Sequence, residues 1–207
     1  MSKPFFSVIV PEHNSSEFMR KGLDSIRRQT FKDYELIIVC DACDDKTVGI
    51  ACEYGDRIFQ TDAGKPCAAR NKGLDEARGE WILFMDDDDW WMRDDAFQII
   101  ADNVGKHGED VLAFGFHWQS RGDTFPTPEQ PWTAIWHKAW KKEFLDRIGA
   151  RFPDWAHSDD DGFSKETLPN AKIEFMHEVL YYYNFLRPGS LTWQIDQGLL
   201  DGTIPAE

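Results

Sequence analysis

Strand and helix signals alternate through roughly the first 85 residues of this chain, and this order is the strongest constraint on its fold. Short apolar runs typical of buried strands are each followed by a stretch with helical periodicity. The strands are expected at residues 6–10, 34–40, 57–60 and 80–85, and the helices at 15–28, 47–54 and 66–77. Strands that alternate with helices form a parallel, doubly wound sheet, so we predict an α/β fold with a mostly parallel central sheet flanked by helices.

The second half has a different character, with longer Pro- and Gly-rich stretches between the elements. We expect a helix at 94–106, a strand at 111–118, a loop at 121–132, an amphipathic helix at 136–148, a loop at 152–161, a short helix at 162–168, a Tyr-rich strand at 179–185 and a short helix after Leu191. A length of 207 residues suits a single domain, 1–207, whose halves (about 1–92 and 93–207) divide after the fourth strand.

The charge balance excludes some classes of partner. The chain has 37 acidic and 23 basic residues, a formal net charge of −14. Because nucleic-acid binding depends on Lys and Arg at the phosphates, we expect no nucleic-acid partner. No apolar stretch is long enough for an integral membrane segment, and the run at 5–10 is too short for a signal peptide, so we expect a cytoplasmic protein. Cys40 and Cys43 have CxxC spacing without a second pair, which favours reduced cysteines over a zinc site.

Four consecutive aspartates, Asp86 to Asp89, follow the fourth predicted strand. Adjacent carboxylates repel one another and raise one another's pKa unless a cation is present. Mn²⁺ or Mg²⁺ would relieve this repulsion, because both take oxygen ligands and share them with phosphates. The alternative is a solvated acidic turn, which the run alone does not exclude.

Polar residues also follow the first two strands, where ligands of parallel sheets bind. Pro11 and His13 come directly after the first strand, and Asp41 follows the second. Arg70, on the helix before the fourth strand, could pair with a diphosphate or remain a surface charge. Together these positions predict one cleft at the edge of the sheet.

The order of these motifs resembles the family 2 glycosyltransferases, which have the GT-A fold. The segments SVIVPEHN, LIIVCDACDD and ARNKGLDEARGEWILFMDDDDW follow the family's order, and the resemblance extends over roughly residues 5–193. It implies a metal-dependent, inverting glycosyltransferase that moves a sugar from a nucleotide-sugar donor to a saccharide or other hydroxyl-bearing acceptor. Residues 1–92 would then form the nucleotide-sugar-binding half, and residues 93–207 the acceptor-side half and tail.

Carried over by position, the resemblance assigns roles to individual residues. The donor-binding positions are Pro11, His13, Asp41, Arg70, Asp86 and Asp87; the metal positions are Asp88 and Asp86; the catalytic positions are Asp160 and Asp159. His13 replaces the usual Tyr, and Asp159 replaces a Glu. With Asp161 next in the chain, which of the three aspartates is the base stays open. From the hydrogen-bonding chemistry of Asp41 we favour a UDP-sugar, with a GDP-sugar as the second candidate.

The nine Trp residues allow two interpretations. An aromatic face suits a sugar ring, so Trp90 and Trp155 are acceptor-side candidates, together with Trp132 and Trp136. Trp136 and Trp140, four residues apart, are better explained as one core-facing side of the helix at 136–148.

Two other functions stay open, a nucleotide-sugar-binding module without turnover and a sugar-phosphate nucleotidyltransferase. The sequence leaves the oligomeric state unknown.

Overall fold

The computed structural model describes residues 3–118, 123–125, 133–155, 158–185 and 187–199. Its strands are β1 (Phe6–Glu12), β2 (Tyr34–Asp41), β3 (Arg57–Thr61), β4 (Trp81–Phe84), β5 (Trp90–Trp91), β6 (Val111–Trp118), β7 (Asp123–Phe125), β8 (Lys138–Lys141) and β9 (Ile173–Tyr183). Its helices are α1 (Met19–Arg27), α2 (Thr47–Tyr54), α3 (Pro66–Glu76), α4 (Ala96–Asn103), α5 (Lys142–Ile148), α6 (Asp159–Thr167) and α7 (Leu191–Asp196). In the described parts, no helix has the length and apolar character needed to cross a membrane.

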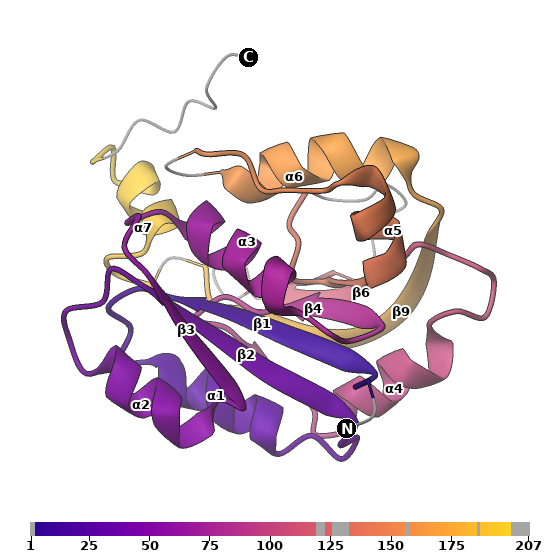
Figure 1. The fold of residues 1–207 in the computed structure, drawn as a ribbon, viewed down its shortest axis with the longest axis horizontal. Helices are drawn as coiled ribbons and strands as arrows, with labels where there is room; N and C mark the ends of the chain where they lie inside the picture. Colours follow the sequence, from indigo (N-terminus) through magenta and orange to yellow (C-terminus); the bar gives the residue numbers. More distant parts are fainter. Residues whose placement is uncertain (1–2, 119–122, 126–132, 156–157, 186, 200–207) are drawn as a thin grey trace.

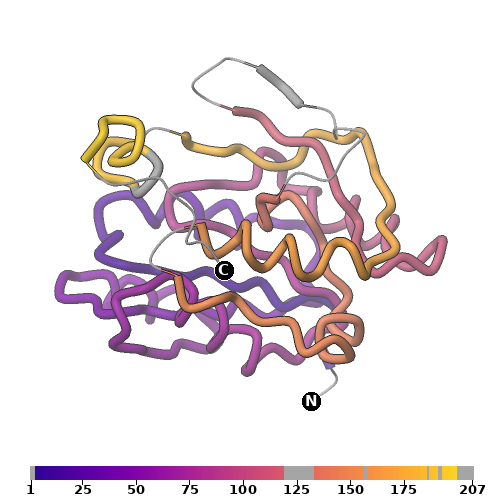
Figure 2. The backbone as a smooth tube through the Cα atoms, turned by 90° about the horizontal axis from the view of Figure 1, so that it is seen from above, coloured from indigo at the N-terminus to yellow at the C-terminus, as the bar shows by residue number. Residues whose placement is uncertain are grey.

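Strands from both halves join in one sheet with the order β3-β2-β1-β4-β8-β6-β9-β5, and β7 pairs with β6. The first four are mutually parallel, as the alternation of strands and helices predicts. The antiparallel pairing of β4 with β8 then connects the second half, in which β6 and β9 run parallel side by side (Figure 2). The predicted α/β fold is confirmed.

Helices cover both faces of the sheet (Figure 1). Because successive side chains of a strand point to opposite faces, Val8 and Val10 pack in one core with α1, α2 and α4. Ile9 packs in the other core, with α3, α5 and α6. Each fully buried aliphatic side chain of this kind contributes about 1.5–3 kcal/mol. The two cores fix both faces of the strands whose carboxyl ends carry the polar residues.

The predicted helix at 136–148 is wrong in its first part. Lys138–Lys141 form β8, and helix α5 begins only at Lys142. The segment is a strand because it lies between β4 and β6 and pairs with both. As a helix it would leave the backbone N–H and C=O groups along those two edges without partners. Trp136 and Trp140 are both buried, but they pack in different cores rather than along one helical side.

The loop predicted at 152–161 is likewise shorter than expected, because Asp159 already belongs to α6. The loop predicted at 121–132 lies mostly outside the described residues, and its described part is β7. Strand β5, which pairs with β9 directly after the acidic run, was not predicted. A two-residue strand carries no periodicity of its own, so only its partner defines it.

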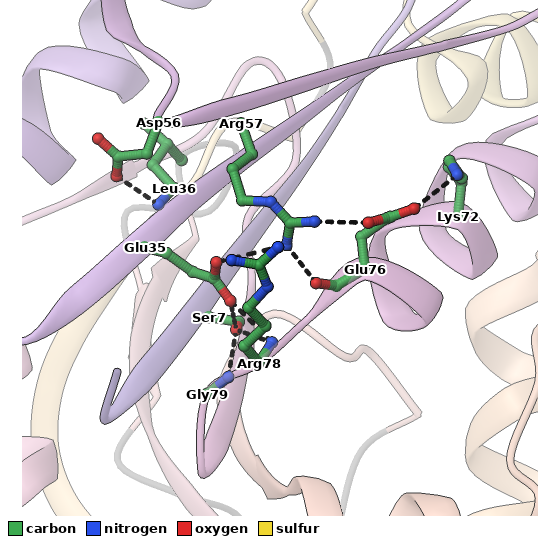
Figure 3. Close-up of polar contacts among 9 residues, drawn as sticks. All are labelled: Ser7, Glu35, Leu36, Asp56, Arg57, Lys72, Glu76, Arg78 and Gly79. Atoms are coloured by element: carbon green, nitrogen blue, oxygen red, sulfur yellow. Dashed lines mark hydrogen bonds and ion pairs between the residues drawn. The ribbon is translucent and has the colours of Figure 1, made fainter. Parts of the chain in front are cut away.

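A polar network connects α3 to the start of the first three strands (Figure 3). Ser7 Oγ donates a 2.6 Å hydrogen bond to Glu35 Oε1, and the backbone N–H of Gly79 donates to Ser7 Oγ at 2.8 Å. Arg57 Nη2 pairs with Glu76 Oε2 at 2.5 Å. The network anchors the C-terminal end of α3, whose other end reaches the carboxyl edge of the sheet.

Candidate active site

A cavity of about 470 Å³ lies at the carboxyl ends of β1, β2 and β4, a size typical of small-molecule sites. Its lining consists of residues 11–13, 41, 64–66, 69–70, 86–88, 136, 158–160, 183–185, 187, 189–190 and 194–195. All the predicted donor, metal and catalytic positions are among them. The acceptor-side candidates Trp90 and Trp155 are not.

Three residues with an unusual backbone conformation lie in or next to the segments that line this cavity. Asn14, Ala42 and Ser158 have φ values of 49°, 48° and 56°, and they are the non-glycine residues with positive φ in the described part of the chain. They follow β1, follow β2 and precede α6, respectively. Such conformations cost roughly 1–3 kcal/mol each and concentrate at functional sites. Here each one redirects the chain beside residues that line the cavity.

Asp41 is buried, and its carboxylate organises the segment after β3. Oδ1 accepts hydrogen bonds from Thr61 Oγ1 at 2.7 Å and from the backbone N–H of Ala63 at 2.9 Å, and Oδ2 accepts one from the N–H of Lys65 at 2.6 Å. His13 Nδ1 donates to the backbone carbonyl of Asp41 at 2.7 Å, since a carbonyl can only accept. The two predicted base-binding residues are therefore fixed beside each other.

Arg70 is buried between two carboxylates. Nη1 lies 2.6 Å and 2.8 Å from the two carboxylate oxygens of Asp159, and Nη2 lies 2.7 Å from Asp86 Oδ1. Burial alone would lower the pKa of Arg70, but Asp159 and Asp86 outweigh it and raise that pKa further. In this structure Arg70 connects the acidic run to α6.

The four aspartates of the acidic run have different surroundings. Asp86 pairs with Arg70, and Asp88 Oδ2 accepts from Arg187 Nε at 2.7 Å. Asp89 is fully buried and accepts from Tyr181 Oη at 2.7 Å and from the N–H of Asn184 at 2.8 Å. Asp89 therefore attaches the acidic run to β9.

Asp87 lines the cavity without an ion pair to any of the residues that the structure describes, and its pKa is well above the usual range. Burial is the main cause and the neighbouring Asp88 adds to it, while Arg187 opposes the shift. The pKa of Asp88 is raised for the same main reason, burial, against its hydrogen bond with Arg187. Without a cation, these two carboxyl groups are therefore harder to ionise than ordinary aspartates.

A divalent cation fits the chemistry of this wall but is not held by a complete protein site. In the described residues, no group of three or more His, Cys, Asp or Glu side chains is arranged to hold a metal ion. Asp86, Asp87 and Asp88 all face the cavity, and hard cations prefer such carboxylate oxygens. A cation bound here would need further ligands, which a diphosphate supplies in many enzymes.

The first turn of α6 separates the roles of its three aspartates. Asp159 is buried against Arg70, whereas Asp160 faces the cavity without an ion pair in the described residues. Burial raises the pKa of Asp160 to about 6; Arg70 opposes the shift and Asp159 adds to it. Asp161 is not among the lining residues. A carboxylate with a pKa near neutrality is suited to accept a proton, so the geometry favours Asp160 over its neighbours.

Sequence reasoning missed the contribution of the C-terminal segment. Tyr183, Asn184 and Arg187 line the cavity, and the guanidinium of Arg187 lies 3.8 Å from the ring centroid of Phe18 while it pairs with Asp88. In the sequence, the only sign of this contact is that Arg187 is the single charged residue of the stretch NFLRPGS. No periodic pattern links it to the aspartates.

Of the Trp residues, Trp136 lines the cavity. Its ring stacks on Tyr181 and Tyr183, with centroids 4.9 Å and 4.6 Å apart. Trp90 instead stacks on Tyr182 at 3.9 Å outside the lining, and Trp155 contacts the α6 region without lining it. An acceptor role for these two stays a prediction. Trp132 lies outside the described residues.

The family model of glycosyl transferase family 2 matches residues 7–164, which include the carboxyl ends of β1, β2 and β4 and the first turns of α6. The chain belongs to this family. It is 39% identical to an uncharacterized glycosyltransferase of Rickettsia typhi over 91% of its length, and 28% identical to EpsJ, an uncharacterized glycosyltransferase of Bacillus subtilis, over 91%. The chain spans 60% and 63% of those two curated relatives.

Solved structures support the same assignment. The chain is similar to TarS of Staphylococcus aureus in complex with UDP, with a TM-score of 0.77, 26% identity, and coverage of 86% of this chain and 60% of that one. Its fold is also that of the mannosyltransferase PcManGT of Pyrobaculum calidifontis, at 18% identity, a TM-score of 0.70 and coverage of 99% and 67%. The GT-A fold implied by the sequence resemblance is confirmed.

Proposed function

We propose that this chain transfers a sugar from a nucleotide-sugar donor, with a UDP-sugar favoured, to an acceptor hydroxyl by a metal-dependent, inverting displacement. The observation that carries the proposal is the shared cavity of Asp160 and the acidic run. A candidate base and a candidate diphosphate site face one space, and Arg70 holds the elements that carry them together.

The candidate base acts on the acceptor. An acceptor hydroxyl beside Asp160 loses its proton to that carboxylate as its oxygen attacks the anomeric carbon of the donor. A pKa of about 6 keeps Asp160 ionised at neutral pH while leaving it basic enough to take the proton. The new bond forms on the face opposite the departing nucleoside diphosphate, so one displacement inverts the anomeric configuration.

The donor would lie along the carboxyl edge of the sheet. Asp41 Oδ2 accepts a single hydrogen bond from the described residues and so has a lone pair left for a base N–H. His13 and Pro11 would flank the base. The TarS relative, solved in complexes with UDP and UDP-GlcNAc at 26% identity, supports the choice of a UDP-sugar.

The diphosphate would lie beside Asp86, Asp87 and Asp88. A divalent cation held there would supply positive charge to the leaving diphosphate. The residues that would hold the cation are Asp86 and Asp88, and Asp87 lies on the same wall. A cation at Asp88 would compete with Arg187, which pairs with Oδ2 of that carboxylate.

The two other functions are less well supported. A binding module without turnover needs no base, yet Asp160 is exposed to the cavity with a pKa near neutrality. A sugar-phosphate nucleotidyltransferase would need a Gly- and Arg-rich phosphate loop after the first strand, and the segment PEHNSSEF has neither residue. Membership of family 2 also favours sugar transfer.

Nucleotide binding followed by turnover tests the proposal. We expect UDP with Mn²⁺ to raise the melting temperature, because a ligand that binds only the native state stabilises it. UDP release from a panel of UDP-sugars should then depend on an added acceptor, and Asp160→Asn should lower turnover by roughly 10²-fold while UDP still binds. Near-normal turnover of Asp160→Asn would exclude it as the base, and no binding of any nucleoside diphosphate would refute the proposed function.

A further inference from the structure

Glu12, the last residue of β1, is a buried carboxylate on the cavity wall that none of the predicted roles explains. It is 2% exposed and belongs to the lining. Its Oε2 accepts a hydrogen bond from Ser15 Oγ. Its Oε1 is also buried but has no hydrogen-bond partner in the part of the chain that the structure describes. A buried acceptor without a partner is costly, so this oxygen is placed to receive a donor from a ligand.

The charges around Glu12 define what that ligand group is. Asp87, Asp88 and Asp45 lie close enough to act on Glu12 electrostatically. Burial and these carboxylates raise the pKa of Glu12 well above its usual range. Diphosphate oxygens would be repelled by the surrounding carboxylates, whereas a hydroxyl can pair with Oε1 because it both donates and accepts. A nucleotide sugar contains two kinds of neutral donor, the N–H groups of its base and the hydroxyls of its ribose and sugar.

The position of Glu12 along the cavity selects between these donors. His13, the next residue, is fixed to Asp41, where the base would bind, and Asp87 belongs to the run where the diphosphate would bind. Side chains alternate along β1, so Glu12 points to the α1 face, away from the face of Pro11. Ribose is the part of a nucleotide between base and diphosphate, so its hydroxyls come nearest to Glu12.

We propose that Glu12 Oε1 accepts a hydrogen bond from a ribose hydroxyl of the donor and makes this site selective for ribonucleotides over deoxyribonucleotides. The proposal rests on the proposed function, since it requires a nucleoside diphosphate in the cavity. Asp41 cannot distinguish UDP from dTDP, because uracil and thymine offer the same N–H to that carboxylate. A contact with the ribose hydroxyl would distinguish them.

Calorimetric titration with UDP, 2′-deoxy-UDP and 3′-deoxy-UDP in Mn²⁺ tests the inference. The native chain should bind UDP on the order of tenfold more tightly than at least one deoxy analogue, since leaving the buried Oε1 without a partner costs about that factor. Glu12→Met keeps the length of the side chain and removes the acceptor. In this variant the affinities for UDP and for the deoxy analogue should therefore differ by less than about twofold. Ser15→Ala is the matched control, because it removes the partner of Oε2 and leaves Oε1 in place; its preference should stay as in the native chain.

The outcomes separate this inference from the function on which it rests. Equal affinity of the native chain for all three nucleotides overturns the role of Glu12 but leaves nucleotide binding intact, whereas no binding of any of them counts against the proposed function. A Glu12→Met variant with the native preference also overturns the inference. If Glu12→Met does not fold, Glu12→Gln replaces it. One neutral acceptor oxygen remains in this variant, so its preference for UDP over the deoxy analogues should be smaller than that of the native chain. An equal or larger preference overturns the inference.

Discussion

Arg70 Nη1 lies 2.6 Å from Asp159 Oδ1, and both side chains are almost completely buried. The same guanidinium reaches Asp86 with its other terminal nitrogen. One side chain of α3 therefore connects the start of α6, with the candidate base, to the end of β4, with the candidate metal position. The planar guanidinium suits this task, because its nitrogens point in fixed directions that two carboxylates can share.

Replacing Arg70 by Met should destabilise the fold and lower turnover together. The change leaves Asp159 buried without its partner, which typically costs about 3–5 kcal/mol. For a chain of this size we expect the melting temperature to fall by roughly 6–20 °C. Arg151→Met is the matched control, since its 2.8 Å pair with Asp75 is about half exposed and should contribute less than about 1 kcal/mol. Similar melting temperatures for the two variants would contradict a structural role for Arg70.

The pH dependence of turnover should follow the ionisation of Asp160. A base must be deprotonated to accept a proton, and burial raises the pKa of Asp160 to about 6. Turnover at saturating substrate should therefore rise with pH up to about 6 and level off above it. The residual turnover of Asp160→Asn should lack this inflection. A native profile that is flat across that range would assign the proton transfer to another group.

The fold was largely predictable because its signals are local. The strands at 6–12, 34–41 and 81–84 are buried on both faces, so each appears in the sequence as an apolar run ended by a polar residue. The edge strand at 57–61 is only partly buried, and its apolar run is shorter. Strand β8 was not predictable in this way. The segment at 138–141 has an amphipathic pattern compatible with a helix, and only the exposed edges of β4 and β6 make it a strand.

The site was predictable where strand ends bring residues together, and not where distant side chains pair. Asp41 and Asp86 follow parallel strands, so the topology alone places them at one edge. The contacts of Arg70 with Asp159 and of Arg187 with Asp88 join residues 89 and 99 positions apart. No sequence spacing encodes such contacts, so the pairing of Arg70 with Asp159 was not predicted.

The contact between Arg187 and Asp88 should compete with metal binding. In Arg187→Ala the carboxylate of Asp88 is released, so Mn²⁺ should bind the nucleotide-free chain roughly fivefold more tightly, as expected for the loss of about 1 kcal/mol of ion pairing. Electron paramagnetic resonance titration of Mn²⁺ measures this directly. Arg93→Ala, which breaks an exposed pair with Asp95, is the control and should leave the affinity unchanged. Unchanged or weaker Mn²⁺ binding by Arg187→Ala would contradict this competition.

Donor binding itself should require the metal if Asp86 and Asp88 share a cation with the diphosphate. Exhaustive chelation should abolish turnover, and added Mn²⁺ or Mg²⁺ should restore it. Isothermal titration of UDP before and after chelation shows whether the loss lies in binding. Full turnover after chelation would remove the metal from the mechanism.

Asp41 should determine the preference for the nucleobase. Its Oδ2 retains a lone pair that can accept the N3–H of uracil, whereas cytosine presents an acceptor at that position and would face the carboxylate unfavourably. Native protein should therefore bind UDP more tightly than CDP by on the order of 1–3 kcal/mol. GDP is the serious competitor, because guanine also offers N–H donors to a carboxylate.

Two substitutions separate this recognition from the structural role of Asp41. Asp41→Asn replaces one acceptor oxygen by an amide that faces N–H donors, so it should lower stability and remove the preference for UDP over CDP. Thr61→Val removes one hydrogen bond to Oδ1 and leaves the carboxylate, so it should lower stability by about 1 kcal/mol and keep the preference. Calorimetric titration of UDP, GDP and CDP on the three proteins, with thermal unfolding alongside, measures both effects. If Asp41→Asn keeps the native preference, Asp41 organises the 61–65 segment without reading the base.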